Sequence, residues 1–137
     1  MRQPECIKSL PVGNVLGEGV LWHPDQQSLW WTDILGCRLY RYHPDSDSLT
    51  EWSTPERLTA FGFVASSQAP QTLVASFDKG FALYTPETGD CHWLAHPEAH
   101  KPGNRFNDGK VDRQGRFWAG TMVEAGDPLA DEDGGAL

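Results

Sequence analysis

Residues 104–112 concentrate side chains that could bind a small polar molecule. They place an arginine, two asparagines, two aspartates and a lysine within nine positions, shortly before the apolar run 117–122. Arginine and asparagine side chains donate hydrogen bonds, and carboxylates accept them or bind hard metal ions. Polar residues at this density beside a buried strand indicate a binding site that includes Arg105 and Asn107.

The tripeptide Asn-Asp-Gly at 107–109 is also typical of a tight hairpin turn, because these residues tolerate positive φ. A cleaner turn follows at 112–115, Asp-Arg-Gln-Gly, with strand-like residues on both sides. We therefore interpret residues 107–111 as strand rather than turn.

The composition is that of one ordinary globular domain. The chain has 137 residues and a net charge of −8, which argues against a nucleic-acid partner because phosphate binding needs clustered Lys and Arg. Its three cysteines are widely spaced, so they indicate neither a disulfide framework nor a zinc site. We find no membrane span and no signal-peptide pattern, and we expect a cytoplasmic protein without a membrane partner.

A repeat organises the chain. The apolar segments 29–33, 73–77 and 117–121 follow one another at a constant step of 44 residues, and each comes after a polar turn. A repeat of about 40–50 residues with four short strands is the signature of a β-propeller blade. The sequence therefore predicts an all-β fold, a partial propeller of about two and a half N-terminal blades made of four-stranded antiparallel sheets.

We expect residues 1–137 to form a single incomplete propeller domain with three successive blades, at about 12–55, about 58–97 and about 104–137. The predicted strands lie near 15–22, 28–33, 37–42, 48–53, 61–66, 72–76, 81–84, 90–95, 106–112 and 116–122. The third blade is expected to be truncated, with Leu137 inside its third strand, and residues 6–12 to form an unpartnered strand. Such a chain cannot close a ring alone, so a complementing chain or self-association would have to complete it.

The repeat also positions the polar residues. A step of 88 residues brings Glu18 level with Phe106, so Glu18, Arg105 and Asn107 belong to the innermost strands of their blades. Innermost strands line the central channel, where these three side chains should converge on one mouth. A carboxylate there suits a hard divalent metal ion.

The segment 104–112, the strand 117–122 and the upstream segment 16–22 (Leu-Gly-Glu-Gly-Val-Leu-Trp) closely resemble the family of regucalcin, gluconolactonase and luciferin-regenerating enzyme. The resemblance runs over essentially the whole chain. It implies the N-terminal half of a six-bladed propeller that hydrolyses sugar lactones with one divalent metal ion (Ca, Zn, Mg or Mn) in the channel.

By this resemblance Glu18 matches the metal-binding glutamate, and Arg105 and Asn107 match residues that hold the sugar. Some members add an acid after the strand 117–122, for which Glu124 is the candidate, although the regucalcin position itself is Ala125. The family's general base, an aspartate, and its other metal ligands lie in the second half, so we expect no catalytic residue within this chain.

The resemblance thus predicts part of a metal-dependent lactonase that opens an aldonolactone to the sugar acid and is inactive as this chain alone. Two alternatives stay open. Propellers with similar channels hydrolyse phosphotriesters, which would keep the fold and change the substrate. A half-propeller could also serve as a binding or scaffold module without catalysis.

Overall fold

The computed structural model describes residues 1–65, 69–124 and 134–137, which form an all-β structure. The first antiparallel sheet has the order β1-β2-β3-β4 and consists of β1 (Gly17–His23), β2 (Ser28–Asp33), β3 (Arg38–His43) and β4 (Ser48–Ser53). The second has the order β5-β6-β7-β8 and consists of β5 (Leu58–Phe63), β6 (Leu73–Phe77), β7 (Phe81–Thr85) and β8 (Asp90–Ala95). A third, two-stranded sheet pairs β9 (Asn104–Val111) with β10 (Phe117–Val123).

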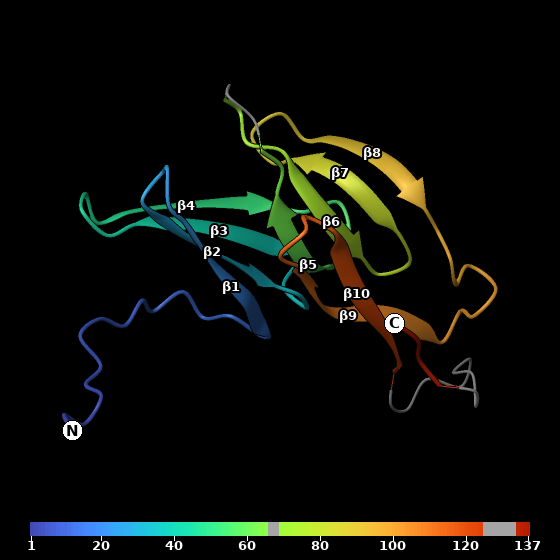
Figure 1. Cartoon of the computed structure of the whole chain (residues 1–137), viewed down its shortest axis with the longest axis horizontal. Helices are drawn as coiled ribbons and strands as arrows, with labels where there is room; N and C mark the ends of the chain where they lie inside the picture. The colour runs from blue at the N-terminus through green and yellow to red at the C-terminus, as the bar shows by residue number, and fades with distance from the viewer. Residues whose placement is uncertain (66–68, 125–133) are drawn as a thin grey trace.

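The predicted repeat corresponds to the second strand of each sheet. The apolar segments spaced by 44 residues lie in β2, β6 and β10, and each pairs antiparallel with the strand before it. The sheets fan apart in Figure 1, with β4 and β8 at outer edges and β5 and β9 near the centre. The architecture is that of a partial propeller. Residues 107–111 lie in β9, which confirms that they are strand rather than turn.

Two predicted strands differ from the structure. The first strand of the second sheet spans Leu58–Phe63 rather than 61–66, because nine residues, 64–72, join β5 to β6 where only four, 24–27, join β1 to β2. Residues 6–12 form no strand, since they find no ladder partner among the described residues and run beside the first sheet as an irregular segment (Figure 1).

The third sheet ends differently from the prediction as well. Residues 134–137 are not part of a strand, although the backbone N–H of Thr121 donates to the carbonyl of Ala136 at 2.7 Å along the free side of β10. The stretch 125–133, which includes Ala125, lies outside the described residues.

The core lies between the first two sheets. Its buried members come from both sheets: Trp30, Leu39, Leu58, Phe61, Leu73, Ala75, Phe77, Ala82 and Tyr84. Buried polar side chains also connect the sheets, because the His23 ring lies 2.9 Å from the Gln71 side-chain oxygen and 4.5 Å, centroid to centroid, from Phe63. Burial of this apolar surface is the main force that fixes β1 against β5.

Glycines let the innermost strands of the second and third sheets approach each other. A Cβ added to Gly62 would lie 2.3 Å from the Val111 side chain, and one added to Gly109 would lie 2.8 Å from the Trp118 carbonyl oxygen and 3.1 Å from the Cβ of Ala60. The 2.3 Å distance between β5 and β9 and the 2.8 Å distance to β10 leave no room for a methyl group, and Ala60 would also have to shift by a few tenths of an ångström. Glycine is therefore required where β9 packs on β5.

We predict that Gly109→Ala lowers the free energy of unfolding by about 1–3 kcal/mol, because the added methyl overpacks a junction that backbone atoms enclose. Gly120→Ala in the adjacent strand is the matched control, since its Cβ would meet only ordinary contacts at 3.6 Å and beyond. Urea unfolding followed by tryptophan fluorescence measures both variants. Equal stability of the two would contradict the close packing of β9 on β5.

Candidate functional site

The first strand of each sheet, β1, β5 or β9, contains a shift in its pairing register. In β1, Glu18 pairs with Thr32 but Leu21 pairs with Trp30, so the register shifts between them. In β5 the shift falls between Leu58 and Ala60. Bulges of this kind re-aim side chains and are common beside binding sites.

The third bulge lies in the segment that the sequence singles out. Phe106 pairs with Thr121 and Gly109 with Ala119, so Asn107 and Asp108 together lie opposite Gly120. A regular strand would point these two side chains to opposite faces. The bulge instead allows both to face one cavity.

A cavity of about 200 Å³ is lined by Glu18, Ile34, Thr59, Asn107 and Asp108. Its polar lining comes from all three innermost strands. The carboxylate of Glu18 and the side chains of Asn107 and Asp108 are exposed, whereas Thr59 is buried and bonded to Ser76. Three residues further along the same strands a second, apolar cavity of about 240 Å³ contains Leu21, Gly62 and Lys110. The surface of these strands is thus mainly polar at the Glu18 end and, apart from Lys110, mainly apolar at the other.

The start of β9 is held by the turn between β6 and β7. The Lys79 ammonium donates to the carbonyl oxygens of Pro102, at 2.7 Å, and Asn104. The backbone N–H of Phe106 donates to the Asp78 carbonyl at 2.9 Å. These bonds fix the backbone on both sides of Arg105, whose side chain is 7% exposed.

Arg105 orients Asn107. Its Nη1 donates to the Phe106 carbonyl at 2.8 Å and to the Asn107 Oδ1 at 3.3 Å. A guanidinium only donates, so the atom it contacts on Asn107 must be the oxygen. Asn107 therefore keeps its NH₂ group as a hydrogen-bond donor for the cavity.

The Glu124 carboxylate contacts two arginine side chains. Arg57 donates to both of its carboxylate oxygens, at 2.8 and 3.0 Å, and the Arg105 Nε lies 3.4 Å away. Arg57 also lies 2.6 Å from Asp78. The hydrogen bonds from Arg57, opposed by partial burial, lower the pKa of the Glu124 carboxyl. Glu124 is thus an ionised counter-charge to two arginines.

The buried Asp33 at the end of β2 fixes the loop that leads to Glu18. Its carboxylate accepts the backbone N–H groups of Val15, Leu16 and Gly36 at 2.9 to 3.0 Å. Burial raises the pKa of Asp33, but these three hydrogen bonds outweigh it, so the pKa in the folded chain lies below its ordinary value. The entry into β1, and with it the position of Glu18, depends on this carboxylate.

The residues at the cavity offer the oxygen ligands that a hard metal ion prefers, but fewer of them than such an ion needs. Glu18 and Asp108 supply carboxylate oxygens, and one oxygen of Asp108 already accepts the Gly109 N–H at 2.8 Å. Calcium prefers about 6–8 oxygen ligands. Within residues 1–65, 69–124 and 134–137, no three His, Cys, Asp or Glu side chains gather into a group that could hold a metal ion.

Comparisons with known proteins show the family of this chain. The family described as "SMP-30/Gluconolactonase/LRE-like region" matches residues 16–137. The chain belongs to this family. It is 36% identical to 6-deoxy-6-sulfogluconolactonase of Pseudomonas putida over 97% of the chain, and 34% identical to L-arabinolactonase of Azospirillum brasilense over 84%.

Solved structures of family members have the same fold. The chain is similar to luciferin-regenerating enzyme, with a TM-score of 0.73 and 26% identity over 86% of this chain and 40% of that structure. It is also similar to a calcium-binding protein, regucalcin, from Agrobacterium tumefaciens, with a TM-score of 0.72 and 32% identity over 80% of this chain and 36% of that structure. The chain spans 42% and 37% of the two lactonases.

The structure brings some of the predicted residues together. Glu18 and Asn107 line one cavity, Arg105 reaches it through Asn107, and Glu124 contacts Arg105 rather than the cavity. Sequence reasoning did not single out Thr59, although a lone hydroxyl in the apolar stretch 58–63 was a usable signal. It also missed Arg57, whose position gave no signal, because its partners are 21 and 67 residues away.

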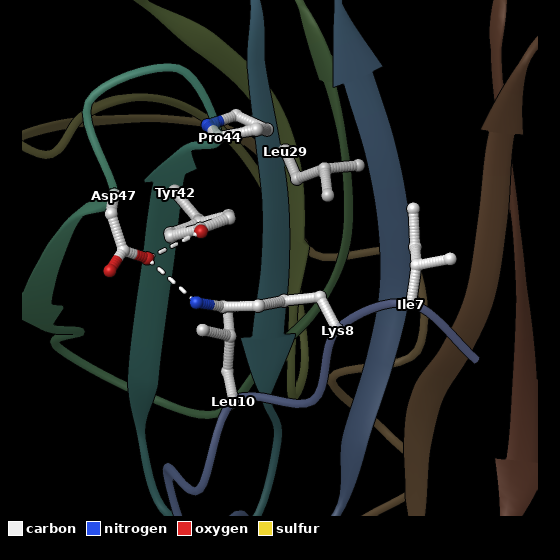
Figure 2. Close-up of a pocket in the computed structure, with 7 residues that line it drawn as sticks. All are labelled: Ile7, Lys8, Leu10, Leu29, Tyr42, Pro44 and Asp47. Carbon is white, nitrogen blue, oxygen red and sulfur yellow. Dashed lines mark hydrogen bonds and ion pairs between the residues drawn. The ribbon is translucent and has the colours of Figure 1, made fainter.

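A larger cavity of about 710 Å³ lies away from this site. It forms between the N-terminal segment and the first sheet, and its lining is Ile7, Lys8, Leu10, Leu29, Tyr42, Pro44 and Asp47. Figure 2 shows Lys8 and Tyr42 converging on Asp47, at 2.9 and 2.6 Å. This exposed ion pair contributes little stability, and the cavity contains none of the predicted site residues. Its size therefore does not mark it as the site.

None of the described segments forms a helix with the length and hydrophobicity needed to cross a bilayer.

We predict that Asp33→Asn destabilises the chain by about 1–3 kcal/mol at pH 7, because an amide NH₂ would replace one of the two accepting oxygens and face a backbone N–H. The folded-state pKa of Asp33 lies below 3.8, so its contribution is present at neutral pH and is lost as pH falls below about that value. The stability gap between wild type and variant should therefore narrow in acid.

Urea unfolding at pH 7 and at pH 3 measures that gap. Asp45→Asn, at an exposed turn position, is the control and should leave stability unchanged. A gap that stays constant between the two pH values would show that Asp33 does not act through its charge.

Proposed function

We propose that this chain forms one side of the active site of a divalent-metal-dependent sugar lactonase, which opens an aldonolactone to the sugar acid. The observation that carries the proposal is the cavity that Glu18 shares with Asn107, with Arg105 bonded to Asn107. The names of the relatives support it, since two are lactonases of sugar derivatives. We further propose that the sheets are about two and a half blades of a six-bladed ring.

Each side chain has a distinct role in this proposal. Glu18 would supply a carboxylate ligand to the metal ion, whose identity we leave open among Ca, Zn, Mg and Mn. Such an ion, when bound, polarises a carbonyl group and lowers the pKa of a bound water. Asn107 donates its NH₂ group to a sugar oxygen, and Arg105 fixes the direction of that donor. This holds the lactone ring in one orientation, which makes the reaction effectively unimolecular.

The charges around the cavity favour an uncharged lactone on the side that this chain supplies. The two arginines beside the cavity, Arg57 and Arg105, are matched by two carboxylates, Asp78 and Glu124. No surplus positive charge is left among these four residues to attract a sulfonate or phosphate group. We propose that the aspartate that acts as general base belongs to another part of the whole protein.

The proposal predicts where ligands bind. A ¹⁵N-labelled chain titrated with an uncharged aldonolactone should show shifts at Asn107 and Arg105, while the chain alone opens the lactone no faster than buffer. Saturable shifts confined to other residues would contradict the site. Hydrolysis of an aryl phosphotriester would favour the phosphotriesterase alternative, and a discrete dimer without lactone binding would favour the scaffold.

We predict that Glu18→Gln abolishes divalent-metal binding, since a neutral amide replaces the carboxylate ligand. Binding to the unchanged chain should be weak, about millimolar, because few ligands are present. Titration with Mn²⁺, followed by paramagnetic broadening of the Gly17 and Gly19 amide signals, measures it. Glu51→Gln, an exposed glutamate on β4 of the same sheet, is the matched control and should bind as the wild type does. Equal broadening in both variants would exclude Glu18 as a ligand.

A further inference from the structure

A chain of contacts connects Arg57, which the site assignment does not include, to the cavity. Arg57 holds both oxygens of Glu124, Glu124 lies against the Arg105 guanidinium, and Arg105 holds the Asn107 oxygen. Arg57 directly precedes β5, Glu124 directly follows β10, and Arg105 and Asn107 lie on β9. The Arg57–Glu124 contact exists because the second and third sheets pack together, whereas the other two contacts lie within the third sheet.

The weakest contact of this chain is the one at Arg105. Its Nε–H is buried and has no aligned hydrogen-bond acceptor among the described residues, although a Glu124 oxygen lies 3.4 Å away. Arg105 is thus held on this side by charge rather than by a directional bond. The Phe106 carbonyl fixes the Nη1 end of the guanidinium at 2.8 Å, and the Glu124 carboxylate is the charge that faces its Nε end.

Arg57 is suited to hold that carboxylate. Its planar guanidinium forms a two-bond fork with Glu124, and the Nη2 of that fork also lies 2.6 Å from an Asp78 carboxylate oxygen. A fork of this kind fixes the plane of the carboxylate, which a lysine ammonium cannot do. The hydrogen bonds to Glu124 and Asp78 also raise the pKa of Arg57, so it stays charged.

We propose that Arg57 is a positioning residue of the site: through Glu124 it sets the Arg105 guanidinium, which in turn keeps the Asn107 NH₂ group directed at the bound sugar lactone. This assigns Glu124 to orienting Arg105 rather than to touching the substrate. The role in lactone binding rests on the proposed function, whereas the geometric relay can be measured without it.

The test uses Arg57→Lys, which keeps the charge and loses the fork, and Glu124→Gln, which keeps the shape and loses the charge. Both should shift the Arg105 Nε–H and the Asn107 side-chain amide signals in ¹⁵N spectra. Both should also weaken lactone binding about tenfold, the cost of roughly one misdirected hydrogen bond.

Arg41 and Glu87 give matched controls. This pair, at 3.2 Å, also links the first sheet to the second, and Arg41 stacks on Trp30 and Trp52 far along the chain from β9. Arg41→Lys and Glu87→Gln should leave the Arg105 and Asn107 signals and the lactone affinity unchanged. If the variants acted only by destabilising the fold, the changes at Arg41 and Glu87 would shift these signals as much as the changes at Arg57 and Glu124.

The outcomes separate the two proposals. Unshifted Arg105 and Asn107 signals in folded Arg57→Lys would overturn the relay, as would shifts of equal size in the Arg41→Lys control. If Arg57→Lys does not fold, Glu124→Gln decides by the same signals. A wild-type chain that binds no lactone would count against the proposed function, while the signals still judge the relay.

Discussion

The close packing of β9 on β5 is the constraint on which the site depends. Gly62 and Gly109 leave no room for side chains at this junction, and their absence of a Cβ brings two innermost strands within contact of each other. If these strands were further apart, Asn107 on β9 and Thr59 on β5 could not line the same cavity. The close packing of the two backbones is therefore a condition for the cavity to form.

The bulges then determine which side chains face the cavity. A regular strand alternates its side chains between faces, so neighbouring polar residues would be separated. The extra residue in β9 lets Asn107 and Asp108 share one face, and Gly19 in β1, with φ of 65°, relaxes the strand directly after Glu18. The bulges thus bring polar side chains together at the end of these strands where Glu18 lies.

The charged side chains near the cavity are paired with one another or with backbone groups. Asp33 anchors the entry to β1, and the arginines near β9 are balanced by carboxylates, which keeps buried charge compensated. The exposed side chains of Glu18, Asn107 and Asp108 are the groups that this arrangement leaves accessible to a ligand. The chain spans about two fifths of the length of the two lactonases.

Sequence patterns predicted the all-β class and the four-stranded antiparallel sheets correctly, because a repeat depends on local alternation and turn residues. The turn at 112–115 and the strands β2, β4 and β8 match their predicted bounds closely, since short hairpins fix their register. The first strand of the second sheet was displaced by three residues because the repeat assumed a hairpin loop of constant length. Residues 6–12, predicted as an unpartnered strand, form no strand, because no described strand pairs with them.

For the site, the sequence by itself determined which chemical groups are available and on which innermost strands they lie. Glu18, Arg105 and Asn107 were identifiable because a motif and a repeat can both be read directly from the order of residues in the chain. Only the tertiary structure decided that Asp108 and Thr59 share the cavity and that Arg57 meets Glu124. The physical reason is that bulges and contacts between sheets depend on how separate strands pack, and residues 67 positions apart carry no local trace of their pairing.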